Sequence, residues 1–141
     1  MKTTLLLTIQ MFQRIRVFHD KDLLHRDIKP DNFLIGSEHK KDTLYAVDYG
    51  LVKAFRYGTT KEHIMFRKDK GVTGTVRYAS INTHMGYEAS RRDDLESIMY
   101  VAIYLFNGFL PWQNTNKQFK NRADLSNFIM NYKIKISSEN L

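Results

Sequence analysis

The chain has 141 residues, of which 43% are hydrophobic and 26% are charged, which is enough for one core and one domain. Cysteine is absent, so a disulfide framework and a cysteine-based zinc site are excluded. No apolar run approaches the ~18 residues of a membrane span, and no signal-peptide pattern opens the sequence. We therefore expect a soluble protein of the cytoplasm or the nucleus, without a membrane partner.

The formal net charge of +7 favours an anionic partner. Nucleic acid is one such partner, because basic proteins gain affinity from phosphate contacts. However, the 22 basic residues are scattered, and no zinc finger, helix-turn-helix or basic helix accompanies them. The charge therefore favours a surface for acidic or phosphorylated proteins over a nucleic-acid site.

The first predicted element is a helix with Thr3 or Thr4 as its N-cap, ending at about Phe18. Apolar residues lie on two of its faces, so we expect this helix to be buried nearly all round. These residues are Leu5, Ile9, Phe12, Met11, Ile15 and Phe18. After a turn at residues 20–22, Leu23-Leu24 is predicted to be a short strand.

A strand pair is predicted next, at Phe33-Leu34-Ile35 and at Leu44-Tyr45-Ala46-Val47. The polar residues 36–43 form the turn between the two strands. Such a hairpin holds Asn32 and Asp48 at its open end, where both side chains can reach one site.

The remainder of the sequence predicts one long loop and two helices. Residues 51–75 are charged and lack a sustained period, so we expect a long ordered loop of the kind that is usually functional. Asp94 begins a strongly periodic helix that Gly108 ends, and Pro111-Trp112 begins an extended turn. Its core-facing positions are Leu95, Ile98, Met99, Ala102, Leu105 and Phe106. A weaker helix is predicted from Arg122 to Tyr132, which makes the fold mainly α with one small antiparallel strand pair.

Residues with catalytic chemistry are concentrated in two short segments. Residues 25–34 read His-Arg-Asp-Ile-Lys-Pro-Asp-Asn-Phe-Leu, and residues 48–50 read Asp-Tyr-Gly. The first segment resembles the H-R-D-x-x-x-x-N catalytic loop of protein kinases, and the second is a near match to their metal-binding D-F-G motif. Two motifs in the right order are far more specific than either alone, so the resemblance indicates phosphoryl transfer.

Phosphoryl transfer explains why these residue types are needed, because the transferred group carries negative charge that must be positioned and neutralised. Asp27 is expected to accept or orient the hydroxyl proton of an incoming serine or threonine. Lys29 is expected to place a positive charge beside the γ-phosphate. Asn32 and Asp48 offer hard oxygen ligands that suit Mg²⁺. ATP and Mg²⁺ are therefore the expected cofactors.

Four segments together resemble one kinase family, casein kinase 1. They are the catalytic loop, residues 73–84, residues 90–97 and residues 110–113. The triplet Ser80-Ile81-Asn82 is especially telling, because this family carries it where most kinases have Ala-Pro-Glu. The resemblance runs from about residue 3 to the final helix, and it implies an α+β protein-kinase-like fold limited to the helical C-terminal lobe of a serine/threonine kinase.

The resemblance also assigns roles by position. Arg77 aligns with the family's arginine that binds a phosphate already present on the substrate, and a surface salt bridge is the alternative. The lysine that assists this arginine belongs to residues 116–122, where the register leaves its identity open. Asp94 matches the buried helix aspartate that holds the catalytic-loop backbone. A second family anion cluster, which can order the activation segment without phosphorylation, matches Arg26, Lys53 and Lys70.

The sequence departs from the family in several places. Tyr49 replaces the phenylalanine of the metal motif, and Asn114 stands where the family usually has glycine, near the substrate anion site. The 141 residues contain neither a G-x-G-x-x-G loop nor a strand lysine of the Val-Ala-Ile-Lys kind. Val101-Ala102-Ile103 matches only the first three residues of that lysine motif, because Tyr104 follows it and it lies within the predicted core helix. We therefore expect residues 1–141 to be a partial kinase domain, with the N-lobe and the terminal C-lobe helices absent.

Two functions follow from these observations. In the first, the chain derives from an incomplete gene model, and its parent transfers the γ-phosphoryl group of ATP to serine or threonine of acidic or pre-phosphorylated proteins. In the second, it is a truncated, catalytically inactive binding module. The intact catalytic loop favours the first, because a binding module has no need to keep Asp27, Lys29, Asn32 and Asp48 together. In either case we expect the 141-residue chain alone to be inactive.

Overall fold

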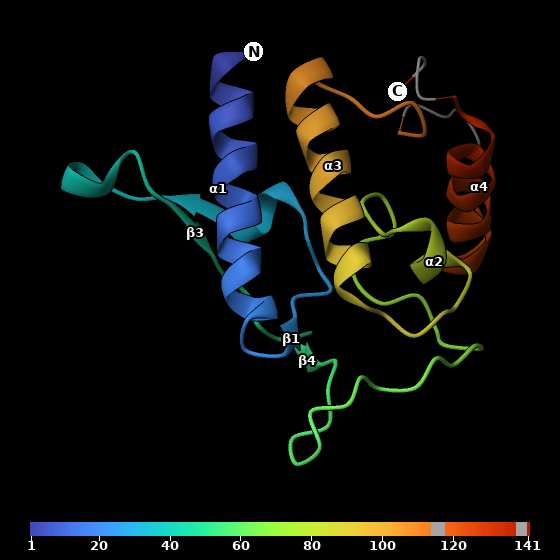
Figure 1. Ribbon diagram of the computed structural model, residues 1–141. Helices are drawn as coiled ribbons and strands as arrows, with labels where there is room; N and C mark the ends of the chain where they lie inside the picture. Colours follow the sequence, from blue (N-terminus) through green and yellow to red (C-terminus); the bar gives the residue numbers. More distant parts are fainter. Residues whose placement is uncertain (114–117, 138–140) are drawn as a thin grey trace.

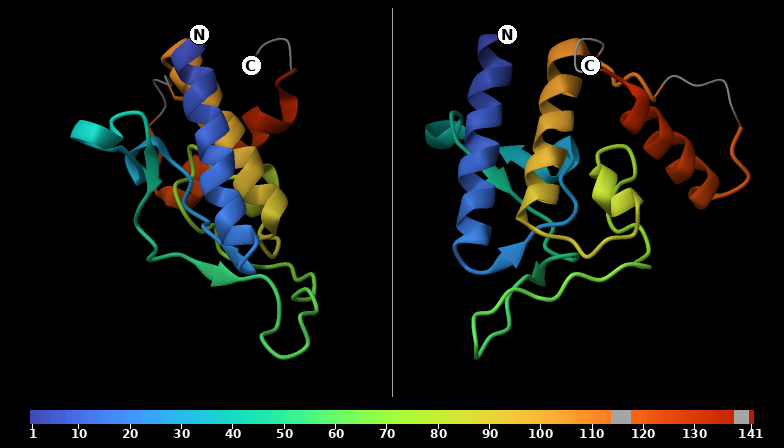
Figure 2. Two further views of the ribbon diagram at one scale, coloured as in Figure 1. Left: turned by 60° about the vertical axis from the view of Figure 1, so that its left-hand side comes forward. Right: turned by 45° about the vertical axis from the view of Figure 1, so that its right-hand side comes forward.

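The computed structural model describes residues 1–113, 118–137 and 141 of the protein. Its long helices α1 (Lys2–His19) and α3 (Arg91–Asn107) lie against each other (Figure 1). The short helix α2 (Ile81–His84) contacts α4 (Arg122–Lys135) on the other side of α3 (Figure 2, right). Within the described ranges no helix is both long and apolar enough to cross a membrane. The fold is mainly helical, as the sequence predicts.

In the part of the chain that the structure describes, the strands form two small antiparallel pairs. β2 (Phe33–Ile35) pairs with β3 (Leu44–Ala46), which confirms the predicted hairpin, and η2 (Glu38–Lys40) lies in its turn. β1 (Leu23–Leu24) pairs with β4 (Lys53–Ala54), a strand that the sequence did not predict. A two-residue strand within a charged loop has no periodicity of its own, so only its pairing with β1 defines it. Part of the loop after β4 projects away from the helices (Figure 2), whereas its end returns to the catalytic loop through Thr75.

Two predictions for α1 are wrong. The helix begins at Lys2 with Met1 as its N-cap, so neither threonine caps it. It is also far from buried on all sides, since Met11 and Ile15 are its only buried residues. Leu5, Leu6, Ile9 and Val17 are each at least half exposed, at 55%, 52%, 53% and 50%. An all-round apolar pattern does not specify which face has a neighbour, and here α3, β1 and β3 cover one side.

Helix α3 begins at Arg91, earlier than predicted, because Ser90 and Asp93 form a capping box. The backbone N–H of Ser90 donates to Asp93 Oδ2 at 2.7 Å. Gly108 ends the helix as predicted, with a left-handed φ of 80°. The predicted core face is only partly correct: Ile98 is fully buried, whereas three of the positions expected in the core are exposed, namely Leu95, Met99 and Phe106.

Helix α4 begins at the predicted Arg122, where the Asn121 side chain accepts the Asp124 N–H at 2.9 Å, and it continues past Tyr132 to Lys135. The turn at Pro111 leads the chain into the core. The buried cluster that joins the elements comprises Met11, Ile15, Ile28, Phe33, Leu44, Tyr78, Ile98, Tyr100, Val101, Leu110, Trp112 and Ile129.

Candidate active site

The catalytic loop is attached to α3 by the carboxylate of Asp94, which is 2% exposed. Asp94 Oδ2 accepts the backbone N–H of His25 at 2.9 Å, and Oδ1 accepts that of Arg26 at 2.9 Å. Nε2 of His19 lies 3.0 Å from Oδ2. Arg26 has a left-handed φ of 67°, which turns the chain out of β1. One buried carboxylate therefore fixes the strained backbone from which the loop starts.

His25 is fully buried and contributes packing and orientation. Its Nδ1 accepts the backbone N–H of Asp27 at 3.4 Å, which leaves Nε2–H to donate to the carbonyl of Val47 at 3.2 Å. Its ring lies 5.4 Å from that of Phe18 and 6.4 Å from that of Tyr49. The Tyr49 hydroxyl, which a phenylalanine at this position would lack, donates to the carbonyl of Ala46 at 2.7 Å.

Asp27 is at the centre of the site and is 8% exposed. Nζ of Lys29 lies 2.9 Å from Oδ2, and the amide of Asn32 donates to Oδ2 at 3.3 Å and to the Asp27 carbonyl at 2.8 Å. Thr75 donates its backbone N–H and its hydroxyl to Oδ1 at 2.9 and 2.8 Å. Burial raises the pKa of the Asp27 carboxyl. The hydrogen bonds from Lys29 and Thr75 lower this pKa by more than burial raises it, so the net shift is downward. The carboxylate is thus ionised and oriented, as a proton acceptor must be.

Thr75 is a site residue that sequence reasoning did not single out. It lies in the long loop after Gly74, whose φ is 78°. A Cβ at Gly74 would lie 2.3 Å from the Arg26 carbonyl oxygen, so only glycine allows the loop to approach the catalytic loop this closely. Gly74 is the sequence feature from which this close approach could have been predicted.

Lys29 keeps its proton. Its hydrogen bond with Asp27 raises the pKa of the ammonium, and the charges of Asp48 and Asp31 add to this increase. A permanent positive charge is therefore present beside the proton acceptor, where charge develops during phosphoryl transfer.

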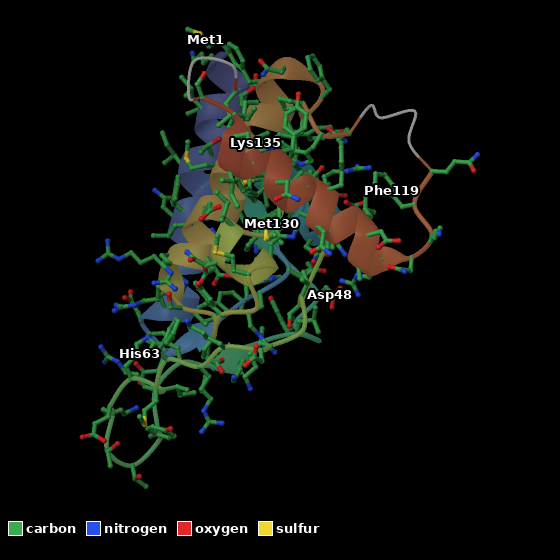
Figure 3. All side chains as sticks on the ribbon, turned by 90° about the vertical axis from the view of Figure 1, so that its right-hand side faces the viewer. Met1, Asp48, His63, Phe119, Met130 and Lys135 are labelled. Carbon is green, nitrogen blue, oxygen red and sulfur yellow. The ribbon has the colours of Figure 1, made fainter. Side chains whose placement is uncertain are left out.

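Asn32 and Asp48 lie at the open end of the hairpin. The backbone N–H of Val47 donates to the Asn32 carbonyl at 2.9 Å, which holds these two ends together. The Asn32 amide nitrogen donates to Asp27, so Oδ1 is the amide atom that could coordinate a metal. Asp48 is exposed, has a φ of 61°, and accepts the Gly50 N–H on Oδ1 at 3.3 Å. Figure 3 labels Asp48 among the surrounding side chains.

This donor set fits Mg²⁺. One exposed carboxylate and one amide oxygen are hard ligands, and Mg²⁺ is typically held by one or two such groups together with water and substrate phosphates. Over residues 1–113, 118–137 and 141, no group of three or more His, Cys, Asp or Glu side chains is arranged to hold a metal. Asn32 and Asp48 are therefore a pair of the kind that holds Mg²⁺ together with water and substrate phosphates.

The structure brings Arg26, Lys53 and Lys70 together around one pocket of about 170 Å³. It also adds a residue that sequence reasoning missed, because the buried Glu88 lies between them. Glu88 Oε1 pairs with Lys53, and Oε2 lies 3.6 Å from Nζ of Lys70. Burial raises the pKa of the Glu88 carboxyl, but the hydrogen bond and charge of Lys53 and the charge of Lys70 lower it overall. The basic cluster therefore already has an internal anion.

Arg77 is exposed, and its carbonyl accepts the indole N–H of Trp112 at 2.9 Å. Among the described residues it has no ion-pair partner, so the surface salt bridge considered above is not formed there. Asn114 and residues 116–117 of the segment expected to assist Arg77 lie outside the described residues. Arg122, at the end of that segment, donates to the Gly74 carbonyl at 2.6 Å.

Comparison with known families agrees with this geometry. The family model of the protein kinase domain matches residues 2–141. The match includes the catalytic loop, the hairpin and the loop that contributes Thr75. Members of this family use ATP and Mg²⁺ in general, which fits the donor set at Asn32 and Asp48. The chain belongs to the protein kinase family.

Proposed function

We propose that this chain carries the catalytic half of a serine/threonine protein kinase of the casein kinase 1 type, which acts on acidic or pre-phosphorylated proteins. The observation that carries the proposal is the environment of Asp27. Its carboxylate is held by Lys29 on one oxygen and by Thr75 on the other, from segments far apart in the sequence. Such an arrangement has a clear chemical use in phosphoryl transfer.

In this mechanism the hydroxyl oxygen of a substrate serine or threonine attacks the γ-phosphorus of ATP. The bond from that phosphorus to the bridging oxygen breaks, and ADP leaves. Asp27 orients the hydroxyl and receives its proton, and Lys29 offsets the charge that develops on the phosphoryl oxygens. Bound Mg²⁺ supplies charge neutralisation of the phosphates. Asn32 and Asp48 would hold it.

Substrate preference is assigned to Arg77. The casein kinase 1-like sequence at residues 73–84, the exposure of Arg77 and the net charge of +7 all support a phosphorylated or acidic substrate. An arginine binds a phosphate through bidentate, charge-assisted hydrogen bonds worth ~1.5–3 kcal/mol. Arg122 reaches the same loop, and it is our candidate for the assisting cation.

A second candidate function is a binding module without catalysis. The observation in its favour is that the 141 residues include no glycine-rich loop to cover the phosphates of ATP. In this case Arg77 would still bind phosphorylated partners, whereas Asp27 would have no role in the activity.

A kinase assay on the chain joined to a kinase N-lobe, which supplies the glycine-rich loop and its lysine, separates these functions. Three peptides differ only in the residue upstream of the acceptor serine, which is phosphoserine, glutamate or alanine, and a fourth has tyrosine as acceptor. We expect serine labelling that is greatest on the phosphoserine peptide and is abolished by Asp27→Asn. Arg77→Ala should reduce labelling of the phosphoserine and glutamate peptides more than that of the alanine peptide.

Equal loss on all serine peptides in Arg77→Ala would contradict the assigned specificity, and labelling of tyrosine alone would contradict the serine/threonine assignment. No transfer by the joined protein, together with Arg77-dependent binding of the phosphoserine peptide, would favour the binding module.

A further inference from the structure

Helix α4 contains a buried lysine, Lys133, that the catalytic roles above do not use. Its side chain is only 4% exposed, whereas Lys135 on the same helix is exposed. Figure 3 shows α4 running across this face of the molecule, with Met130 and Lys135 labelled on it. A buried amine is costly without partners, because desolvation disfavours its charged form. Its position therefore calls for an explanation in terms of specific contacts.

The contacts of Lys133 lie on both sides of Arg77. Nζ donates to the carbonyl of Ala79 at 2.5 Å and to that of Val76 at 3.4 Å, and it lies 3.3 Å from Nε2 of His84. The same nitrogen lies 4.4 Å from the ring centre of Tyr100 and 4.9 Å from that of Trp112. Two aromatic rings and two carbonyl oxygens thus surround one amine, and these contacts accommodate the lysine at a buried position.

The segment from Val76 to Ala79 is also held at other points. The Trp112 indole N–H donates to the Arg77 carbonyl, and Thr75, immediately before the segment, donates to Asp27. Tyr78 is buried, with its ring 6.0 Å from that of Tyr104. The backbone on which the exposed Arg77 stands is therefore fixed by α4 and Trp112 on one side and linked to the catalytic carboxylate on the other.

We infer that Lys133 is a positioning residue, which holds the Val76–Ala79 backbone so that Arg77 is aimed at a substrate phosphate. This inference rests on the proposed function, in which Arg77 distinguishes phosphorylated from unphosphorylated peptides. A bidentate contact to phosphate depends on the direction of the guanidinium, so a segment that is free to shift would lose this discrimination before it lost general peptide binding.

The chemistry of the amine supports this role. Burial lowers the pKa of Lys133 to about 7, against an opposing effect of the Glu96 charge. In both protonation states a lysine amine keeps at least two N–H donors, one for each carbonyl that it contacts. A methionine has nearly the same length and can occupy the same space, but it cannot donate to either carbonyl. Lys133→Met therefore removes the contacts while keeping most of the packing.

The chain contains one tryptophan, Trp112, and its indole N–H is bonded to the segment in question. The rate at which this proton exchanges with solvent, measured by NMR on the full 141-residue chain, reports directly on the segment. The second measurement is the ratio of affinities, by fluorescence anisotropy, for a phosphoserine peptide and for the same peptide without phosphate. Lys133→Met is compared with wild type, with Arg77→Ala and with the matched exposed control Lys135→Met.

In Lys133→Met we expect indole exchange to be at least about 10-fold faster, because the segment opens locally. The affinity ratio should fall about 5-fold or more toward unity, as it does in Arg77→Ala, while Lys135→Met retains both wild-type values. Far-UV circular dichroism establishes that the variants are folded. Where Lys133→Met does not fold, Lys133→Gln, whose amide nitrogen ends one bond short of the lysine nitrogen, is measured against the same two criteria.

Wild-type indole exchange in the Lys133 variant, or faster exchange with an unchanged affinity ratio, would overturn the positioning role. Failure of the proposed function is distinguishable, because it is seen without any Lys133 variant. It would appear as equal affinities of the wild-type chain for the two peptides, or as an unchanged ratio in Arg77→Ala. Either of those results would also remove the role assigned to Lys133.

Discussion

The catalytic loop and the β2–β3 hairpin are adjacent in the sequence, but they differ in how far their side chains are covered by the rest of the fold. Asp27 is 8% exposed, and both of its carboxylate oxygens accept hydrogen bonds. In the hairpin, Leu34 and Ile35 are 54% and 62% exposed. The carboxylate of Asp27 therefore has its hydrogen-bond partners within the described residues, whereas apolar side chains of the neighbouring hairpin remain uncovered. The hydrogen bonds around Asp27 are thus already formed, and the 141 residues contain no G-x-G-x-x-G sequence.

The strongest test of this contrast is activity. We expect the 141-residue chain alone to show no turnover above background with ATP, Mg²⁺ and an acidic protein substrate. Positioning of the reactants can supply ~7–11 kcal/mol of a catalysed barrier. General-base assistance from Asp27 supplies only about 10²–10⁴-fold, or ~3–5 kcal/mol. The glycine-rich loop that would provide positioning is not among these residues, and the smaller contribution cannot replace the larger one.

A radiolabelled-ATP assay on the purified chain checks this expectation, with Asp27→Asn as its control. Turnover clearly above background that disappears in Asp27→Asn would contradict it, and would show that one half of the site is sufficient.

The next largest effect concerns the attachment of the catalytic loop. Asp94→Ala removes the acceptor of the His25 and Arg26 backbone N–H groups. Each buried donor left unpaired costs ~1–3 kcal/mol, so the loss of both should lower the free energy of unfolding by ~2–6 kcal/mol. Urea denaturation measures this loss. The control is Asp20→Ala, which removes an exposed ion pair with Arg16 at 3.6 Å and should change stability by less than ~1 kcal/mol. Equal losses in the two variants would argue against an anchoring role for Asp94.

These contacts also show which features could be predicted from sequence. The β2–β3 hairpin and the end of α3 at Gly108 were predicted because their signals are local. The bonds from Thr75 to Asp27 join residues that are 48 positions apart, and no periodicity encodes such a contact. Glu88 was missed for the same reason. Lys133 was missed because a single lysine in a helix is ordinarily an exposed residue.

A pH effect of intermediate size is expected at His84, which is 7% exposed and lies against Ser126 and Lys133. Burial, and then the charge of Lys133, lower its pKa from 6.5 to about 4. Between pH 6.5 and pH 4 the His84 side chain binds a proton in the unfolded chain but not in the folded chain. The contribution of His84 to stability is therefore fully present above pH 6.5 and is lost as the pH falls toward 4. From pH 7 to pH 5 the expected loss in the free energy of unfolding is about 2 kcal/mol.

Urea denaturation at the two pH values measures this loss. In His84→Asn, which retains a polar group near the Nδ1 position but does not titrate, most of the difference should disappear. The same decrease in the wild type and in His84→Asn would assign the effect to other groups.

The smallest expected effect returns to the uncovered surface of the hairpin. Leu34 pairs with Tyr45 across the strands, and both side chains are exposed, whereas the neighbouring Phe33 is 8% exposed in the core. Replacing Leu34 and Ile35 by threonine keeps residues that suit a strand and removes apolar area that the fold does not bury. We therefore expect the free energy of unfolding to change by less than ~0.5 kcal/mol, while light scattering shows less self-association. Phe33→Ala, one position away, should instead lose ~3–5 kcal/mol. A loss in the double threonine variant similar to that of Phe33→Ala would mean that this face is part of the core after all. The contrast between the fully bonded Asp27 and the uncovered hairpin would then no longer hold.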